Sequence, residues 1–237
     1  MVLPPFFQEK RPEVLHRKMA ENPLSALVTH GANGLDANHV PFEFDASLGE
    51  HGILRAHVPR ANPICQEIES GSEVLIIFQG SAGYISPTFY PSKQETHRQV
   101  PTYNYLVVHA HGRIAIRDDE TFVRGVVARL TRKMEAGEAV PWKMGDAPPD
   151  FIQTMLQAIV GIETEVTRLV GKAKLSQNKA AVDRTGAING VRKLETDADS
   201  ARRRNVERPA SYWKYALTFQ SLECRYWLHR AEFNVSH

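Results

Sequence analysis

The sequence predicts a mainly β fold with helical decoration (α+β), built around a small barrel. Two observations support this prediction. Five or six short segments have strand-like apolar patterns, several separated by turns rich in glycine and aspartate. Segments of helical periodicity lie among and after them without the regular strand-helix alternation of a parallel doubly wound sheet. The 237 residues suffice for one large domain with an appendage.

The first part of the chain predicts a helix followed by a β-hairpin. Apolar residues at helical spacing indicate a helix over residues 12–21, which ends before Pro23 because proline disfavours α geometry in the preceding residue. Strands are expected at 24–30 and 39–44 around a Gly-Ala-Asn-Gly turn. Further strands are expected at residues 53–58, 74–79, 106–116 and 162–170.

Helices are expected between and after these strands. Residues 62–70 indicate a helix after the strand at 53–58, and the segments 121–135 and 149–160 have apolar residues three and four apart. Asp118, Asp119 and Asp146 are candidate N-caps for the latter two. A final helix is expected at 177–191. The composition then changes, so we expect a domain over residues 1–191 and a C-terminal appendage of uncertain order over 192–237.

Composition restricts the partners of the chain. The formal net charge is only +2, so DNA binding would need a local basic patch, and Arg202–Arg204 with Arg208 form the densest one. No apolar run is long enough to span a membrane, and the N-terminus lacks the features of a secretory leader. Two well separated cysteines fit a reducing compartment. We therefore expect a cytoplasmic protein.

The motif HVPRANP at residues 57–63 has the pattern of an anion site. It leaves a strand and enters a predicted helix, with Asn62 as the N-cap and Pro63 at the first helical position. Free backbone N–H groups there favour a phosphate, to which Arg60 would add a bidentate fork and His57 another donor. The alternative is an ordinary capped helix with a solvent-exposed arginine.

Other polar groups allow weaker hypotheses. His39, His57, His109 and His111 suggest a metal site, but no carboxylate or cysteine lies at a matching spacing, so none is assigned. The nucleophile elbow, the Walker loop and the GxGxxG fingerprint are absent from the sequence, and no catalytic residue can be named. Tyrosines near residues 79–105 would suit a planar ring system, although ordinary core packing is the better explanation of each one taken singly.

Six motifs, taken in order, resemble those of the PaiB-type FMN-binding negative transcriptional regulators. The resemblance extends to about residue 191 and implies an FMN-binding split β-barrel related to pyridoxamine phosphate oxidase-like folds. It also implies a homodimer with the cofactor at the subunit interface. The motifs are GLDANHVPFEFD (34–45), LRAHVPRANP (54–63), VLIIFQGSAGYISPTFYPSK (74–93), VPTYNYLVVHAHGRI (100–114), AIVGIE (158–163) and GKAKLSQNKAA (171–181).

The resemblance assigns residues to the cofactor. The phosphate falls on His57, Arg60 and Asn62, and Asn38 and His39 would run beside the ring. Ala173 departs from the family, which usually has an aromatic residue there, and Phe89 and Tyr103 stand where tryptophan is common. Further contacts, some of them from the partner subunit, are expected from Ser86, Lys93, Tyr103, Lys174 and Gln177.

Three functions follow as expectations. The first is a flavin-responsive transcriptional regulator, although no helix-turn-helix is visible. The alternative is a flavin-dependent oxidoreductase of the pyridoxamine phosphate oxidase-like class without direct DNA binding. A haem-binding split barrel is a weaker third option, with His39, His57 or His109 as candidate axial ligands.

Overall fold

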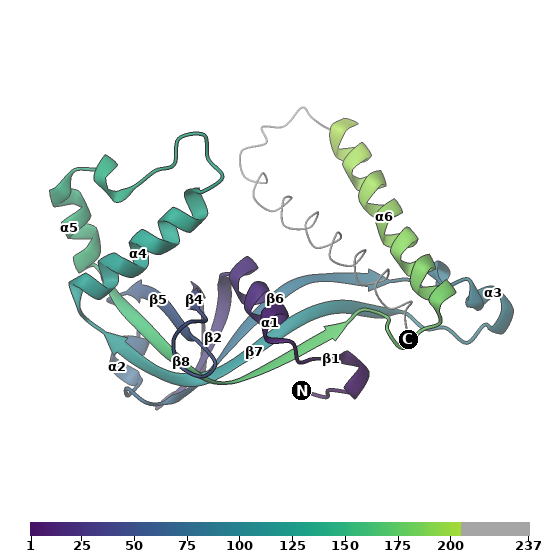
Figure 1. The fold of residues 1–237 in the computed structure, drawn as a ribbon, viewed down its shortest axis with the longest axis horizontal. Coiled ribbons are helices and arrows are strands. Elements are labelled where there is room, and N and C mark those ends of the chain that lie inside the picture. The colour runs from purple at the N-terminus through teal and green to yellow at the C-terminus, as the bar shows by residue number, and fades with distance from the viewer. Residues whose placement is uncertain (205–237) are drawn as a thin grey trace. The chain divides into compact units, whose positions relative to one another are not determined.

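The computed structural model describes residues 1–204 and shows a mainly β protein with helices (Figure 1). The predicted fold class is confirmed at this level. The strands are β1 (Gln8–Glu9), β2 (Leu24–Gly31), β3 (Gly34–Pro41), β4 (Glu43–Asp45), β5 (Ile53–Pro59), β6 (Glu73–Ile85), β7 (Thr102–Arg117) and β8 (Ile159–Lys174). The helices are α1 (Pro12–Glu21), α2 (Ile64–Glu67), α3 (Ser92–Thr96), α4 (Glu120–Glu135), α5 (Pro149–Gln157) and α6 (Ala181–Arg204), with 3-10 turns η1 (Pro5–Phe7), η2 (Pro87–Phe89) and η3 (Met144–Asp146).

The strands form one eight-stranded sheet. Its order is β3-β2-β6-β7-β8-β5-β4, and β1 pairs with β8. β2 pairs antiparallel with β3 and β6, and β5 pairs antiparallel with β4 and β8. The predicted hairpin is confirmed, but its second strand is Gly34–Pro41 and not 39–44, since residues 43–44 belong to β4, which pairs with β5.

The chain divides into two compact units, and each is described by itself. One comprises Met1–Gln8, Gly80–Leu106 and the chain from Lys172 onward, and the other comprises Glu9–Gln79 and Val107–Gly171. We call the second one the barrel unit and the first one the arm unit. β6, β7 and β8 continue from one unit into the other, so the units share these strands.

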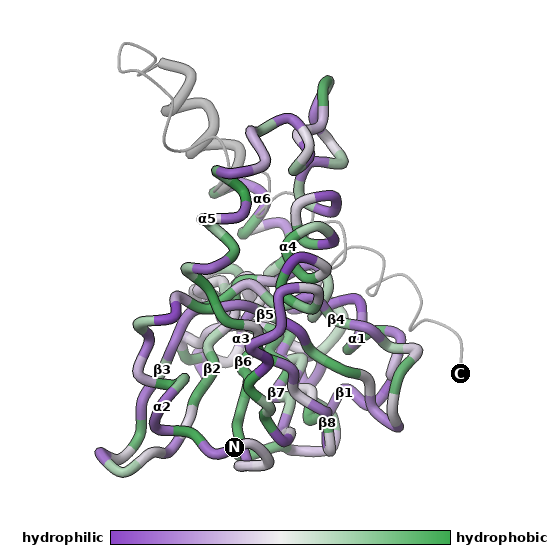
Figure 2. Tube along the Cα trace, turned by 90° about the vertical axis from the view of Figure 1, so that its left-hand side faces the viewer, coloured by the Kyte–Doolittle hydropathy of each residue, from purple (hydrophilic) through white to green (hydrophobic). Residues whose placement is uncertain are grey.

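The core of the barrel unit comes from the period-two pattern of its strands. Leu27, Leu54, Ile76, Val108 and Ile162 are fully buried, whereas their strand neighbours are mostly half-buried. Figure 2 shows hydrophobic residues concentrated in β6 and β7. Each such side chain contributes about 1.5–3 kcal/mol by leaving water. This inner face therefore holds the strands together.

Helices α4 and α5 pack next to the β5–β8 pair. Val123, Ile152 and Leu156 form their shared core, and Phe122 packs against it. Gly161 of β8 permits the close approach, because a Cβ there would lie 2.5 Å from the Phe122 ring and 2.9 Å from the Arg117 carbonyl oxygen. Asp119 begins α4 as predicted, since its carboxylate accepts a hydrogen bond from the Phe122 N–H at 2.7 Å.

In the arm unit, α6 packs on the segment around η2. Ile85, Tyr90 and Ala187 form a small buried core, with Phe89 and Val191 against it. Two glycines of α6 permit this contact, since added Cβ atoms would meet Phe89 at both positions: Gly186 and Gly190.

Several predicted boundaries are wrong. The helix expected at 62–70 is only the single turn Ile64–Glu67. Asp146 does not cap α5, which begins after Pro148. Its carboxylate instead accepts from the Lys143 N–H, and residues 159–160 belong to β8. The last helix begins at Ala181, later than expected, and continues to Arg204. The division into a domain over residues 1–191 and an appendage over 192–237 stays a prediction. Residues 205–237 lie outside the described part of the chain.

No helix among the described residues is long and apolar enough to cross a membrane.

Candidate functional site

The turn from β5 into α2 is organised by the Asn62 side chain. Its Oδ1 accepts a hydrogen bond from the Ile64 N–H at 3.0 Å, and its Nδ2 donates to Oδ1 of Asn38 at 2.7 Å. The predicted hydrogen bond from Asn62 to the start of the helix is present, but α2 begins at Ile64, so Pro63 and not Asn62 occupies the N-cap position. The Asn62–Asn38 bond brings together two of the predicted cofactor residues. α2 has only four residues, so its dipole is too small to make an anion site by itself.

Asn38 and His39 lie on opposite faces of β3. The register pairs Asn38 with Leu27, whose side chain is in the core, and pairs His39 with Ala26, whose side chain points the other way. Asn38 is half-buried and also donates from Nδ2 to Asp36 at 2.9 Å, whereas His39 is exposed. Consecutive strand residues cannot both line one side of a ring. Of the two, only Asn38 hydrogen-bonds to the β5–α2 turn.

Arg60 does not present the free fork that the motif predicts. Nη1 and Nη2 donate to the two carboxylate oxygens of Asp118 at 2.6 and 2.7 Å. Nε donates to the Gln157 carbonyl oxygen at 2.9 Å, and Nη2 also donates to the Ile159 carbonyl at 3.4 Å. Four of the five N–H donors are thus in use. The guanidinium connects the turn to the end of β7 and to the α5–β8 junction.

The Arg60–Asp118 pair is accessible to solvent. The side chains are 48% and 58% exposed, and such surface pairs contribute little to stability. The hydrogen bond from Arg60 lowers the pKa of Asp118, so the carboxylate is charged at neutral pH. An anion approaching Arg60 would therefore compete with a charged but weakly held partner.

His57 has an unsatisfied buried atom. It lies opposite Gly161 in the β5–β8 register, on the face away from Leu54, Ala56 and Val58. Its Nδ1 is buried and has no hydrogen-bond partner within the described residues. Burial lowers the pKa of His57, so the imidazole is neutral at pH 7. A neutral ring nitrogen without a partner suits a polar ligand atom.

In the arm unit the remaining predicted cofactor residues make local contacts. The Lys174 ammonium donates to Thr102 Oγ1, and Gln177 bonds to the backbone of Ala173 and Leu175. Tyr103 is 58% exposed and packs edge-on against Tyr84, with ring centroids 5.7 Å apart. Ser86 accepts from the Thr88 N–H at the start of η2, and Lys93 is half-buried on α3.

A buried carboxylate anchors this region and escaped the sequence reasoning. Asp183 accepts hydrogen bonds from the Ser92 N–H and Oγ at 3.0 and 2.7 Å and from Gln99 Nε2 at 3.2 Å. Lys179 donates to Gln99 at 2.7 Å. In the sequence, Asp183 looks like an ordinary acidic residue in the first turn of a helix, where it would interact with the helix dipole. Only the three-dimensional structure shows its distant partners.

Asn104 is a second buried polar residue that the sequence analysis did not single out. It is 1% exposed, donates from Nδ2 to Ser176 Oγ at 2.9 Å, and has an Oδ1 without a partner among the described atoms. The signal was available, because a polar residue interrupts the apolar face of a strand between Tyr103 and Tyr105. Asn104 and Ser176 therefore join two of the motifs that carry the family resemblance.

The predicted site residues thus fall into two groups. The barrel unit holds Asn38, His39, His57, Arg60 and Asn62, whereas the arm unit holds Ser86, Lys93, Tyr103, Lys174 and Gln177. His109 and His111 point to one side of β7 and are half-buried. Among the described side chains, those of residues 1–194, no group of three or more residues could hold a metal ion.

The fold is that of a split β-barrel, and comparison with known proteins identifies the family. Residues 1–168 match the family described as "Putative FMN-binding domain". The chain belongs to this family. The predicted cofactor, FMN, is therefore confirmed at the level of the family.

Relatives extend over most of the chain. An uncharacterised protein of Emericella nidulans is 32% identical over 226 residues, which cover 80% of this chain and 90% of that protein. "Protease synthase and sporulation protein PAI 2" of Bacillus subtilis is 27% identical over 195 residues, or 82% of this chain and 91% of the relative. The second match confirms the resemblance found in the sequence motifs.

A solved structure shares the fold. The flavocytochrome Anf3 of Azotobacter vinelandii matches with a TM-score of 0.51 at 12% identity, over 71% of this chain and 69% of that one. At this identity the likeness concerns the fold alone.

The buried histidine predicts a pH dependence of stability. The pKa of His57 is lowered from 6.5 in the folded state, so the unfolded chain takes up the proton first as the pH falls. The free energy of unfolding of the apoprotein should therefore decrease from about pH 7 downward through about pH 6. Burial also lowers the pKa values of His16, His109 and His111, which add to the slope.

His57→Gln should make this slope shallower in urea titrations between pH 7.5 and pH 5, because it removes one of these protons. Equal slopes in wild type and His57→Gln would contradict a depressed pKa at His57.

Proposed function

We propose that this protein is a homodimeric FMN-dependent redox protein that binds the flavin phosphate at the β5–α2 turn. The observation that supports it most is the FMN-binding family match over residues 1–168, which spans this turn and the Asn38–Asn62 hydrogen bond. Bound FMN supplies reversible electron and hydride transfer, while the protein positions the ring and tunes it. In this proposal Arg60, His57 and Asn62 bind and orient it.

Arg60 is the proposed cation for the phosphate. Its ion pair with Asp118 is exposed, so a dianionic phosphate can replace one weakly held carboxylate with a stronger acceptor. The bonds from Nε to the Gln157 carbonyl and from the Arg60 N–H to the Ala158 carbonyl remain, and they keep the side chain oriented. In this proposal Asp118 holds the Arg60 guanidinium in place when no ligand is bound, and it competes with the phosphate for that guanidinium.

His57 and Asn62 complete the proposed binding set in the barrel unit. His57 Nδ1 is buried and without a partner among the described residues, and in this proposal it bonds to a polar ligand atom once the side chains that cover it move apart on binding. Asn62 fixes the turn through its bonds to the Ile64 N–H and to Asn38.

The competition between Asp118 and phosphate predicts opposite effects of two substitutions. Asp118→Asn removes the competing charge and should tighten FMN binding several-fold. Arg60→Gln removes the cation and should weaken it by roughly tenfold, the loss typical of one charge-assisted contact. Isothermal titration of the apoprotein with FMN measures both.

Arg117→Gln is the matched control, because Arg117 also ends β7 in an exposed ion pair, with Glu163. It should leave the affinity for FMN unchanged. Weaker binding in both Arg60→Gln and Asp118→Asn would show that the pair serves only to hold the turn, and would contradict phosphate binding by Arg60.

The proposed dimer uses the outer face of β2 and β6. Ala26 and Val28 pair in register with Ile77 and Leu75, and all four side chains are half-buried on the face away from the core. Leu35 on the neighbouring edge strand β3 is 77% exposed. An apolar face next to an open strand edge is typical of a surface that another chain covers.

Light scattering of the full chain should give twice the chain mass of 26.7 kDa. Val28→Glu places a charge in the proposed interface and should shift the protein to the monomer. Val140→Glu, at a side chain 87% exposed in the loop after α4, should not. A monomeric wild type, or a Val28→Glu variant that stays dimeric with native circular dichroism, would contradict this interface.

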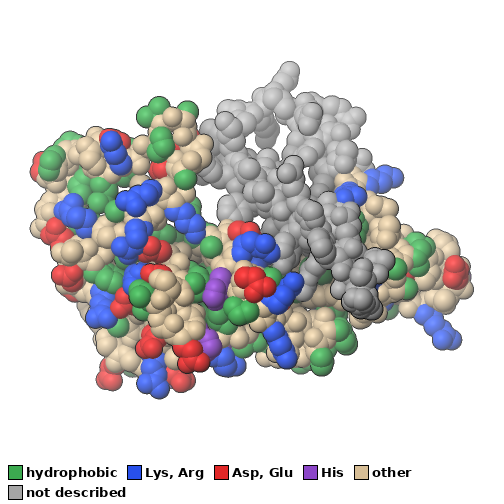
Figure 3. Space-filling view, viewed as in Figure 1, with side chains coloured by type: hydrophobic (Ala, Val, Ile, Leu, Met, Phe, Trp, Pro, Cys, Tyr) green, Lys and Arg blue, Asp and Glu red, His purple; other side chains and the backbone are tan. Residues whose placement is uncertain are grey.

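A regulatory role is the second candidate, and the likeness to PAI 2, named for protease synthesis and sporulation, favours it. Direct DNA binding has less support, because the basic side chains of α4 are largely engaged within the barrel unit. Figure 3 shows basic and acidic side chains interspersed over the part that carries α4 and α5. Arg124 bonds to Glu120 and Gln153, Arg129 to Glu43, and Lys133 to the Ala20 carbonyl.

Anaerobic mixing of the FMN-loaded protein with NADH or NADPH separates the two candidates. A redox role predicts bleaching of the flavin absorbance by one of the nucleotides within seconds to minutes, followed by its return on admission of air. A flavin that only dithionite reduces would contradict the redox proposal. Sequence-specific retention of promoter DNA at physiological salt would then support regulation. The cytoplasmic location stays a prediction.

A further inference from the structure

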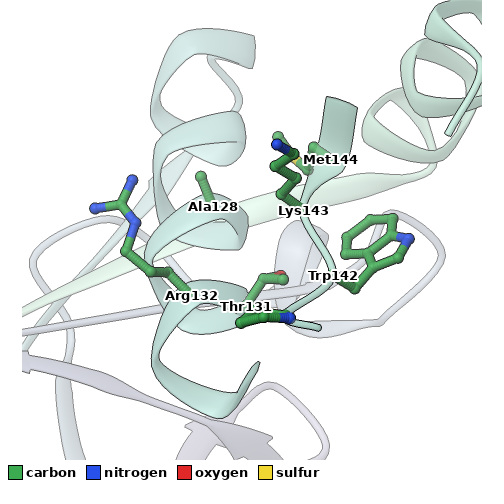
Figure 4. A pocket seen from close by; sticks show the side chains of 7 residues that line it. Ala128, Thr131, Arg132, Trp142, Lys143 and Met144 are labelled. Carbon is green, nitrogen blue, oxygen red and sulfur yellow. The ribbon is translucent and has the colours of Figure 1, made fainter. Parts of the chain in front are cut away.

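A cavity lies in the barrel unit, between α4 and the loop that follows it. It has a volume of about 290 Å³, at the small end of the range for ligand sites, roughly 300–1,000 Å³. The residues assigned to the flavin do not line it. Its lining residues are Ala128, Thr131 and Arg132 of α4 and Pro141, Trp142, Lys143 and Met144 of the loop (Figure 4).

The loop that forms one wall is fixed by its acidic residues. The Glu135 carboxylate accepts from the Trp142 N–H at 3.0 Å, and the Asp146 carboxylate accepts from the Lys143 N–H at 3.0 Å. Asp146 also donates its own N–H to the Lys143 carbonyl at 2.9 Å. The nearest acids are thus bound to the loop backbone, and no acidic side chain lines the cavity.

The lining combines a flat apolar wall with cations. Ala128 and Thr131 face the loop from α4 in Figure 4, and Trp142 and Lys143 rise from the loop in different directions. Trp142 is 42% exposed, so part of its ring is open to contact with a ligand. Arg132 directs its guanidinium away from the loop, so Lys143 is the cation placed for direct contact.

We propose that this cavity binds a small organic anion with one aromatic ring, such as an arylacetate. The ring would pack against Trp142 and the apolar wall, and the carboxylate would accept from Lys143 and the Thr131 hydroxyl. Arg132 adds attraction at longer range. This chemistry follows from the lining, because every charged side chain in it is basic and its apolar side chains can exclude water from one ring.

Titration of the FMN-loaded full chain with phenylacetate, followed by ligand-observed NMR or calorimetry, tests this site. We expect a dissociation constant in the high micromolar to millimolar range. The neutral isostere phenylacetamide should bind at least several-fold more weakly. Lys143→Gln should weaken phenylacetate by roughly fivefold to tenfold and abolish the preference over the amide.

Two further variants locate the binding. Ala128→Leu fills the cavity from the α4 side and should remove binding without loss of FMN. Arg113→Gln deletes an exposed cation elsewhere in the barrel unit and should change nothing. Equal affinity for phenylacetate and the amide, no binding at millimolar concentration, or unchanged binding in Ala128→Leu would each overturn the proposal. None of these results depends on the redox activity of FMN.

Discussion

The antiparallel pairing of β5 with β8 is the constraint on which the barrel-unit site depends. It fixes Pro59 opposite Ile159, so β5 ends where α5 passes into β8. Arg60 then bonds to that junction through both its backbone and its side chain. The same register places His57 beside Gly161, whose missing Cβ lets Phe122 and α4 approach the sheet. One strand pair thus determines the turn, the histidine and the covering helix.

For ligand binding, the consequence is that the β5–α2 turn is already ordered, while the Arg60 guanidinium is already paired with Asp118. Asn62 and Asn38 hold the backbone, and Asp118 holds the Arg60 guanidinium without any ligand. Such an arrangement avoids the entropy cost of ordering a long side chain on binding, at the expense of displacing one carboxylate. In the arm unit, Asp183 has a similar structural role, because it joins the start of α6 to the segment around Ser92.

The sequence predicted the strands and the Asn62 contact well because both depend on local pattern. Alternation identified β5 and β7, and Asn62 bonds to the start of α2 as its position indicates. Local pattern does not report which distant acceptor a side chain will find. For this reason only the structure shows that Asp118, at the end of β7, is the partner of Arg60. The opposite orientations of Asn38 and His39 became clear from the pairing of β3 with β2, because the strand was expected to begin at residue 39. The length of α2 was overestimated because the apolar spacing continues beyond Glu67, where the backbone turns extended at Ile68.

The central claim is that this chain binds FMN, and the absorption spectrum of the purified protein tests it most directly. The account predicts flavin bands either in the protein as isolated or after addition of FMN and removal of the excess by gel filtration. It also predicts about one flavin for each chain, because every subunit carries its own copy of the β5–α2 turn. A protein that is colourless as isolated and retains no flavin after this treatment would contradict the account.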